Sequence, residues 1–412
     1  MLSFLKWPGN WTLPPLAHLI MTSPFLSLSA QRLVKSLITL LVSTFAALMV
    51  AEGLVRLLLP QPLTVPWADQ VSGVLAPRPN VRGREFVPDT YDVTISFSSQ
   101  RFRGQREYSA QPDAGAFRIA ALGDSVTFGN GANDGQDYPS QLESILQERF
   151  ARTSSSRKPE VINAGIGGTG TAEQALWYEN WVRLFHPDLV VLNVFCNDVD
   201  GDLRSNLFSL GANETASPLT AGKILSSARK LRSLQKLIAD LPGYGWLAQH
   251  SQSFNLVRTA IGGALDSSRR AVRTAPSSQA QPAGMDEQFR KKGLALMAGE
   301  MVWLEQRVKA SGARLAVVFV PCRETVYPSD APWAEEVRWK SVAMVERLQD
   351  MTSKQNIPFV DLTSSIRERS SRVREPLYYN GRLDTHPDPL GYRIIAELVA
   401  QFLLEKELMV SN

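Results

Sequence analysis

From residue 116 onward, short apolar runs alternate with helical patterns, and this alternation constrains the fold more than any other feature of the 412-residue chain. The predicted strands are 117–122, 161–164, 188–194, 314–320 and 358–362. The predicted helices are 138–150, 171–185, 297–311, 335–355 and 389–405. Near-continuous apolar strands that alternate with helices form a parallel sheet covered on both faces. In such sheets, functional sites lie at the carboxyl ends of the strands.

The N-terminal region contains an apolar segment, 35–60, that is long enough to cross a membrane. A helix over 36–59 would be about 36 Å long, against a hydrocarbon core of about 30 Å. Lys6, Arg32 and Lys35 precede the segment, which favours a cytoplasmic N-terminus. A cleaved signal peptide is the alternative, but the apolar run exceeds a signal core of about 7–15 residues and no A-x-A site follows it.

The pattern predicts a cytoplasmic tail at 1–34, a transmembrane anchor at 35–60, a stalk with a small β element at 61–115, and an α/β domain at 116–412 with a helical insertion at about 200–295. The formal net charge is only +4, so no global basic field indicates a nucleic-acid partner. Within the insertion, residues 203–284 hold ten Lys and Arg against three Asp and Glu. Such a basic stretch is either a solvated helical face or a lid that meets anionic lipid or an acidic glycan.

Gly123, Asp124 and Ser125 directly follow the first predicted strand. Gly123 permits a tight turn, and Ser125 then lies where a strand ends and a helix begins, which exposes a nucleophilic hydroxyl. Backbone N–H groups in such a turn can stabilise an oxyanion. A plain turn with Ser125 as a helix cap is the structural alternative. Asp124 is expected to brace the loop rather than to react.

The next two strand ends supply further candidate oxyanion donors. A glycine-rich loop at 165–170 follows the second strand, where glycine lets the backbone approach a ligand closely. Asn197 follows the third strand, and its amide could donate to the same oxyanion. Cys196, one of only two cysteines, is expected to be buried and neutral, because no second histidine is placed to activate it.

Of the four histidines, His386 is the one predicted on a loop at the active edge of the sheet. The others lie before the anchor, at the opposite end of the sheet, or in the insertion: His18, His186 and His250. Asp384, two residues before His386, can hold the ring in one tautomer. Ser125, His386 and Asp384 therefore form a nucleophile, a base and an orienting acid.

Taken in order, these elements resemble blocks I, II, III and V of the SGNH (GDSL) hydrolase superfamily. The matching positions are Gly123-Asp124-Ser125, Gly168, Asn197 and His386. The resemblance covers roughly 115–200 and 295–405. It implies a flavodoxin-like three-layer α/β/α fold and acyl-ester chemistry, with Ser125, Gly168 and Asn197 forming the oxyanion hole. It implies no cofactor and no metal.

Two positions depart from the usual pattern of that superfamily. Block V commonly has Asp-x-x-His, but Leu383 occupies that acid position here and Asp384 is two residues before the histidine. Some membrane-tethered members, including acetyltransferases resembling those of alginate biosynthesis, use Asp-x-His. Phe195 replaces a glycine of block III, which narrows the pocket beside Asn197 and leaves the donor in place.

These features predict a membrane-anchored serine esterase or deacetylase that forms an acyl-enzyme on an extracytoplasmic ester, carried by a glycan or a lipid. One alternative is an O-acyltransferase module for an envelope polysaccharide, served by a multi-span acyl-donor protein. Another is a catalytically silent glycan-binding protein, against which the complete triad argues. The loop 321–324 after the fourth strand reaches the same edge, either to position substrate or simply as a strand exit.

Overall fold

The computed structural model describes residues 28–153, 157–211, 214–219, 240–273, 288–327, 332–379 and 386–409. The chain forms two compact units, residues 1–60 and 61–412. The first contains helix α2 (Leu28–Leu58). Among the described helices, α2 alone is long and apolar enough to cross a membrane, and none of its apolar window is buried. A signal sequence near the N-terminus also meets these criteria of length and composition, so α2 by itself fixes no topology.

The second unit is built on a five-stranded parallel sheet, as the strand–helix alternation predicts. Its spatial order is β11 (Phe359–Asp361), β10 (Arg314–Val320), β7 (Leu189–Phe195), β5 (Ala116–Leu122) and β6 (Lys158–Asn163). The chain starts in β5, moves outward to β6, and then returns across β5 to β7. The strand order therefore reverses between β5 and β7, where doubly wound sheets form their ligand crevice.

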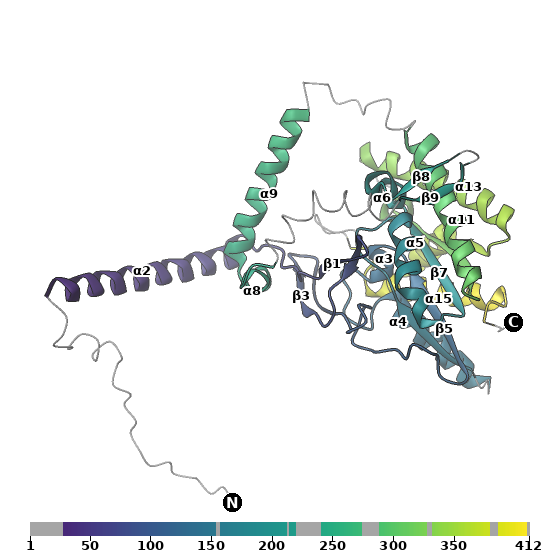
Figure 1. The fold of residues 1–412 in the computed structure, drawn as a ribbon, viewed down its shortest axis with the longest axis horizontal. Helices are drawn as coiled ribbons and strands as arrows, with labels where there is room; N and C mark the ends of the chain where they lie inside the picture. The colour runs from purple at the N-terminus through teal and green to yellow at the C-terminus, as the bar shows by residue number, and fades with distance from the viewer. Residues whose placement is uncertain are drawn as a thin grey trace, which may run out of the picture. The chain divides into compact units, whose positions relative to one another are not determined.

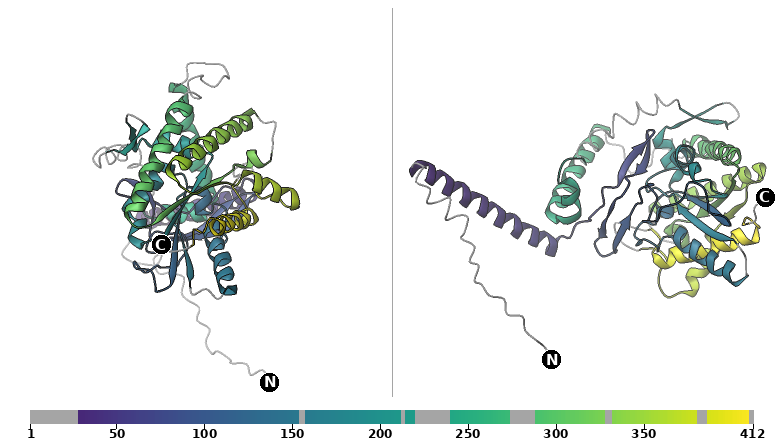
Figure 2. Two further views of the ribbon diagram at one scale, coloured as in Figure 1. Left: turned by 90° about the vertical axis from the view of Figure 1, so that its right-hand side faces the viewer. Right: turned by 60° about the horizontal axis from the view of Figure 1, so that its bottom comes forward.

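Helices cover both faces of this sheet (Figure 1, Figure 2). One layer consists of α5 (Thr171–Asn180), α11 (Leu294–Ala310) and α13 (Pro332–Gln355), and the other of α4 (Tyr138–Arg152), α14 (Thr363–Arg372) and α15 (Pro389–Glu405). Successive side chains of β5 point to opposite faces of the sheet, so Ala120 and Leu122 pack against the first layer while Ile119 and Ala121 pack against the second. All four side chains are fully buried, which explains the unbroken apolar run of this strand.

Local signals fix where the helices beside the site begin. Asp137 caps α4 by accepting a hydrogen bond from the Ser140 N–H, at 3.0 Å. Asp388 caps α15 by accepting from the Gly391 N–H, at 2.7 Å. Each capping aspartate satisfies one of the free N–H groups of a first helical turn. The start of α15 is thereby fixed only three residues after His386.

The predicted elements differ from the observed ones in three places. The expected helix at 171–185 ends at Asn180 and continues as a short 3₁₀ turn (Val182–Phe185). Helix α14 was not expected, because Ile366 is its only buried side chain and the helical pattern is weak. The insertion is not wholly helical, since α6 (Asp198–Ser205) leads into a hairpin of β8 (Phe208–Leu210) and β9 (Ala216–Pro218).

The rest of the insertion is helical where it is described. It contains α8 (Tyr244–His250), α9 (Gln252–Arg273) and a π-helical turn (Gln288–Gly293). Two parts of the expected helical insertion, 220–239 and 274–287, lie outside the described residues.

Residues 61–115 contain two antiparallel hairpins that pack against the helix that follows β5. The hairpins are β1 (Ala68–Val71) with β2 (Val74–Pro77), and β3 (Arg82–Val87) with β4 (Tyr91–Ser96). The Phe128 ring stacks against Trp67 and Phe97, with centroid distances of 5.8 and 5.7 Å. This region is therefore part of the second unit, and its small β element lies beside the predicted nucleophile.

A buried cation, Arg118, secures the amino-terminal end of β5. Its side chain is 1% exposed and donates to Glu160 at 2.9 Å. It also donates to the backbone carbonyls of Ser109 and Phe185, at 2.8 and 2.6 Å. This arginine thus ties two loops and a neighbouring strand to the central sheet.

Replacing Arg118 should destabilise the protein strongly, because Glu160 would lose its buried partner and two carbonyls would lose their donors. For Arg118→Met we expect the free energy of unfolding to fall by about 3–5 kcal/mol, measured by urea denaturation. Arg84→Met is the matched control, because its ion pair with Asp92 is about half exposed and should contribute only ~0–1 kcal/mol. Equal losses in the two variants would contradict this role for Arg118.

Candidate active site

A tight turn after β5 presents Ser125. A Cβ on Gly123 would lie 2.1 Å from Thr127 Oγ1 and 2.9 Å from the Asn193 carbonyl, so only glycine fits there. Ser125 then opens the short helix α3 (Ser125–Phe128). The Asp124 carboxylate caps that helix by accepting from the Val126 N–H at 2.9 Å, and its other oxygen lies 3.1 Å from Ser125 Oγ. Asp124 therefore braces the turn, as expected from the sequence.

His386 lies directly beside the serine, although 261 positions separate the two residues. His386 Nε2 is 2.8 Å from Ser125 Oγ. The backbone positions the ring, because the His386 carbonyl accepts a hydrogen bond from the Tyr379 N–H at 2.8 Å and α15 begins at Pro389. Asp384 lies outside the described residues, so its role as the orienting acid remains a prediction.

Asn130 is a neighbour of His386 that the sequence did not reveal. Its Nδ2 atom is 3.2 Å from His386 Nδ1, and its backbone carbonyl accepts from the Tyr392 hydroxyl at 2.9 Å. The orientation of an amide group is an assignment, and with the amide oxygen turned to Nδ1 the ring carries its proton there. Nε2 is then free to accept the proton of Ser125. The sequence did not indicate this role because Asn130 lies between two glycines, and such a segment has the composition of an ordinary turn.

The glycine-rich loop after β6 lies directly against the nucleophile turn. The Ile166 N–H donates to the Gly123 carbonyl at 3.0 Å. A Cβ on Gly165 would lie 2.3 Å from the Phe128 nitrogen, and one on Gly167 would lie 3.9 Å from Ser125 Cβ. Gly168 follows in the left-handed region with φ of +79° and open space around it. The loop therefore offers backbone N–H groups close to Ser125.

Asn197 lies at the carboxyl end of β7, the neighbour of β5 in the sheet. Its side chain is exposed and, among the described residues, the amide has no hydrogen-bond partner. The adjacent Asp198 is buried instead, and accepts from the Phe195 N–H at 3.1 Å. The backbone is thus fixed while the Asn197 amide remains able to donate to a bound oxygen.

The expectation of a free, neutral Cys196 was wrong. Cys196 forms a disulfide with Cys322, and their Cα atoms are 6.0 Å apart, which is ordinary disulfide spacing. The two residues follow β7 and β10, which are adjacent strands, so the bond joins two loops at the active edge. The loop 321–324 reaches that edge as predicted and continues into the short helix α12 (Arg323–Val326). The disulfide was not predicted because 126 positions separate the two cysteines, although the predicted sheet brings both strand ends together.

A group of buried carboxyl groups lies beneath this edge. Burial raises the pKa of Asp124 and raises that of Asp198 well above its ordinary value. Asp202 belongs to the same group, and burial raises its pKa to about 7. Glu300 of α11 neighbours Asp202, and burial together with that carboxyl raises the pKa of Glu300 as well. Protonation therefore lowers the charge that the fold has to bury.

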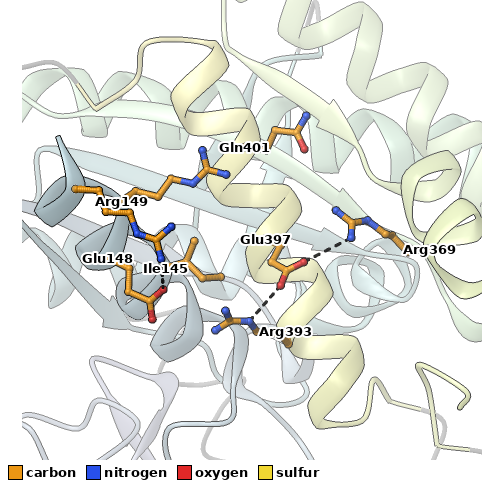
Figure 3. A pocket seen from close by; sticks show the side chains of 8 residues that line it. Ile145, Glu148, Arg149, Arg369, Arg393, Glu397 and Gln401 are labelled. Carbon is orange, nitrogen blue, oxygen red and sulfur yellow. Dashed lines mark hydrogen bonds and ion pairs between the residues drawn. The ribbon is translucent and has the colours of Figure 1, made fainter. Parts of the chain in front are cut away.

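A separate hollow of about 230 Å³ lies between α4, α14 and α15 (Figure 3). Glu397 lies between Arg393 and Arg369 there, with N–O distances of 3.2 and 3.8 Å. Neither Ser125 nor His386 lines this hollow. Arg152 likewise pairs with Glu148 in this hollow. We therefore assign the chemistry to the strand ends.

The comparison with protein families agrees with this geometry. A GDSL-like lipase/acylhydrolase family model matches residues 121–394, two-thirds of the chain and all the described site residues. The chain belongs to the GDSL-like lipase/acylhydrolase family. It is therefore an ester-hydrolysing enzyme with the SGNH fold, and the resemblance found in the sequence is confirmed. No curated protein sequence matches this acylhydrolase significantly.

Several solved structures are similar to this GDSL acylhydrolase. One is a putative lipolytic protein of the G-D-S-L family from Desulfitobacterium hafniense, with 13% identity over 70% of this chain and 99% of the other, at a TM-score of 0.37. Another is a mutant of an acetyl-xylooligosaccharide esterase from Geobacillus Stearmophilus, with 14% identity over 69% of this chain and 93% of the other, at a TM-score of 0.37. A third is an acetyl xylan esterase, with 14% identity over 69% of this chain and 98% of the other, at a TM-score of 0.34. These likenesses assign no substrate to this chain.

Asn130 should act as a positioning residue for His386. We expect Asn130→Ala to lower kcat on a soluble acetyl ester by about tenfold, because the ring loses a hydrogen bond that fixes its orientation. Asn130→Asp keeps an oxygen in place and adds a charge that stabilises the imidazolium. The acidic limb of its activity–pH profile should therefore move to higher pH. Unchanged kcat in the first variant and an unchanged profile in the second would show that Asn130 only packs.

Proposed function

We propose that this acylhydrolase is a membrane-anchored serine esterase or deacetylase with Ser125 as nucleophile, His386 as base and Asp384 as orienting acid. The carrying observation is the 2.8 Å separation between His386 Nε2 and Ser125 Oγ. It places a base within hydrogen-bond distance of a hydroxyl at the point where the strand order of the sheet reverses.

The proposed reaction has two steps. His386 accepts the proton of Ser125 Oγ as that oxygen attacks the ester carbonyl, and backbone N–H groups of Ser125 and Gly168 hold the oxyanion with the Asn197 amide. The alcohol leaves with the proton from His386, and the acyl group stays on Ser125. Water then attacks the acyl-enzyme while His386 accepts its proton, which releases the acid and restores the serine.

We place the substrate outside the cytoplasm, as an O-acylated glycan or lipid. Helix α2 supports a single span with its cationic flank in the cytoplasm. The Cys196–Cys322 disulfide supports the same assignment, because disulfides persist in oxidising compartments and are rare in the cytosol.

A second candidate is an O-acyltransferase, in which a sugar hydroxyl rather than water resolves the acyl-enzyme. The apolar helix and the Asp-x-His spacing favour it, because tethered acetyltransferases with that spacing share this superfamily. A multi-span protein would supply the acyl group. The two functions therefore differ in the source of the acyl group and in the hydroxyl that resolves the acyl-enzyme.

Ser125→Ala should abolish hydrolysis of p-nitrophenyl acetate by the full-length protein, with kcat falling by at least about a thousandfold. His386→Ala should cause a similar loss, and the double variant should be no worse, because the two residues act as a unit. Ser144→Ala is the matched control, since that exposed serine lies on α4. Activity retained in Ser125→Ala would refute the mechanism. Acyl transfer to an added oligosaccharide, in place of released acid, would assign the second function.

The proposed compartment predicts that both cysteines are oxidised in the protein taken from cells. Denatured full-length protein should gain no maleimide–polyethylene glycol adduct before reduction and two adducts after it, measured by gel shift. Cys322→Ser should give one adduct without reduction, because Cys196 is then unpaired. Two adducts on the unreduced original protein would contradict an oxidising location.

A further inference from the structure

Exposed apolar side chains of the second unit concentrate on one helical hairpin. Outside α2 and Leu59, six large apolar side chains are exposed among the described residues: Leu184, Leu241, Trp246, Val257, Ile261 and Val342. Four of the six belong to α8, to α9 or to the turn before them. Trp246 is 63% exposed, and Val257 and Ile261, one helical turn apart, are each 56% exposed. Scattered apolar residues are ordinary, but such a concentration marks an interaction surface.

The hairpin is a well-defined structural element. The Asn255 side chain is fully buried, and its amide donates to the carbonyls of Ala248 and Ser251, at 2.9 and 2.8 Å, which closes the corner between α8 and α9. The Tyr244 and Phe254 rings pack edge to face across that corner, with centroids 5.5 Å apart. Beyond this corner, α9 extends away from the sheet and its covering helices (Figure 1). Its sequence is strongly amphipathic, and two apolar side chains of its described part, Val257 and Ile261, are exposed.

Hydrogen bonds fasten this hairpin to the segment that follows the apolar helix. The Gln61 N–H donates to the Gln252 side-chain oxygen, and Arg258 Nη2 donates to Thr64 Oγ1 at 3.3 Å. Gln61 is only the third residue after Leu58, the end of α2. Three residues reach about 10 Å at most. The first turn of α9 is therefore held to the segment that directly follows α2 in the sequence.

We propose that the α8–α9 hairpin is a second membrane contact, lying on the bilayer surface with Trp246, Val257 and Ile261 in the interfacial layer. The proposal rests on the proposed span by α2. Tryptophan favours this layer, and amphipathic helices lie in its plane with the apolar face toward the acyl chains. The hairpin also belongs to the basic stretch 203–284, which suits anionic headgroups. Two contacts hold the catalytic unit in one orientation, whereas an anchor alone would let it rotate.

The test uses the full-length protein reconstituted into vesicles of phosphatidylcholine and phosphatidylglycerol. A single cysteine introduced as Ile261→Cys carries an environment-sensitive fluorophore, and the disulfide-bonded native cysteines stay unlabelled. Val342→Cys is the matched control, because Val342 on α13 is equally exposed at 56% and lies across the molecule from α9 (Figure 1). Nitroxides on the lipid acyl chains then quench any label that enters the bilayer.

We expect lipid nitroxide to quench the label at position 261 at least about threefold more than the label at 342. Equal quenching, with the protein retained through alkaline carbonate extraction, would overturn the hairpin contact and leave the span intact. Shielding of position 261 from aqueous iodide without lipid quenching would indicate a protein partner, such as a second copy, and would also overturn it. Release by carbonate would overturn the span and with it the hairpin contact, whereas hydrolysis of a soluble ester tests the esterase separately.

Discussion

The contact between His386 and Ser125 depends on the parallel sheet beneath it. Ser125 follows the first strand of the sheet, and His386 precedes the last helix, so neither can reach the other until nearly all of the domain has folded. The strand reversal between β5 and β7 creates the crevice in which they meet. Capping of α15 by Asp388 and of α3 by Asp124 then fixes both ends of the contact. The reactive pair is thus a product of the global topology rather than of one motif.

Most of the sheet could be predicted because parallel strands buried on both faces have a strong sequence pattern. All five strands and the helix at 389–405 follow from apolar runs and periodicity. Helix α14 could not be predicted, because a helix with a single buried residue has no apolar periodicity. The family resemblance, carried by short motifs at the strand ends, was confirmed by the family match.

Within the site, the sequence allowed us to predict those residues whose side chains are reactive on their own. Ser125 is a reactive type at a strand end, and His386 is one on the loop before the last helix. Asn130 would act only through His386, and it resembles a turn residue. The disulfide was missed because each cysteine was considered separately, although their strands are adjacent. The packing of Trp67 and Phe97 on Phe128 could not be predicted either, since these rings come from distant segments and belong to no sequence motif.

The buried carboxyl groups beneath the strand ends make folding a proton-uptake reaction. Asp202 has a pKa of about 7 in the folded protein, whereas an unfolded aspartate has a pKa of about 3.8. Between these values the native state binds a proton that the unfolded chain has released, so the contribution of Asp202 to stability declines as pH rises from about 4 to about 7 and then levels off. Glu300 and Asp198 shift in the same direction. The conformational stability of this enzyme is therefore coupled to the acidity of its surroundings, and mildly acidic media favour the native state through these groups.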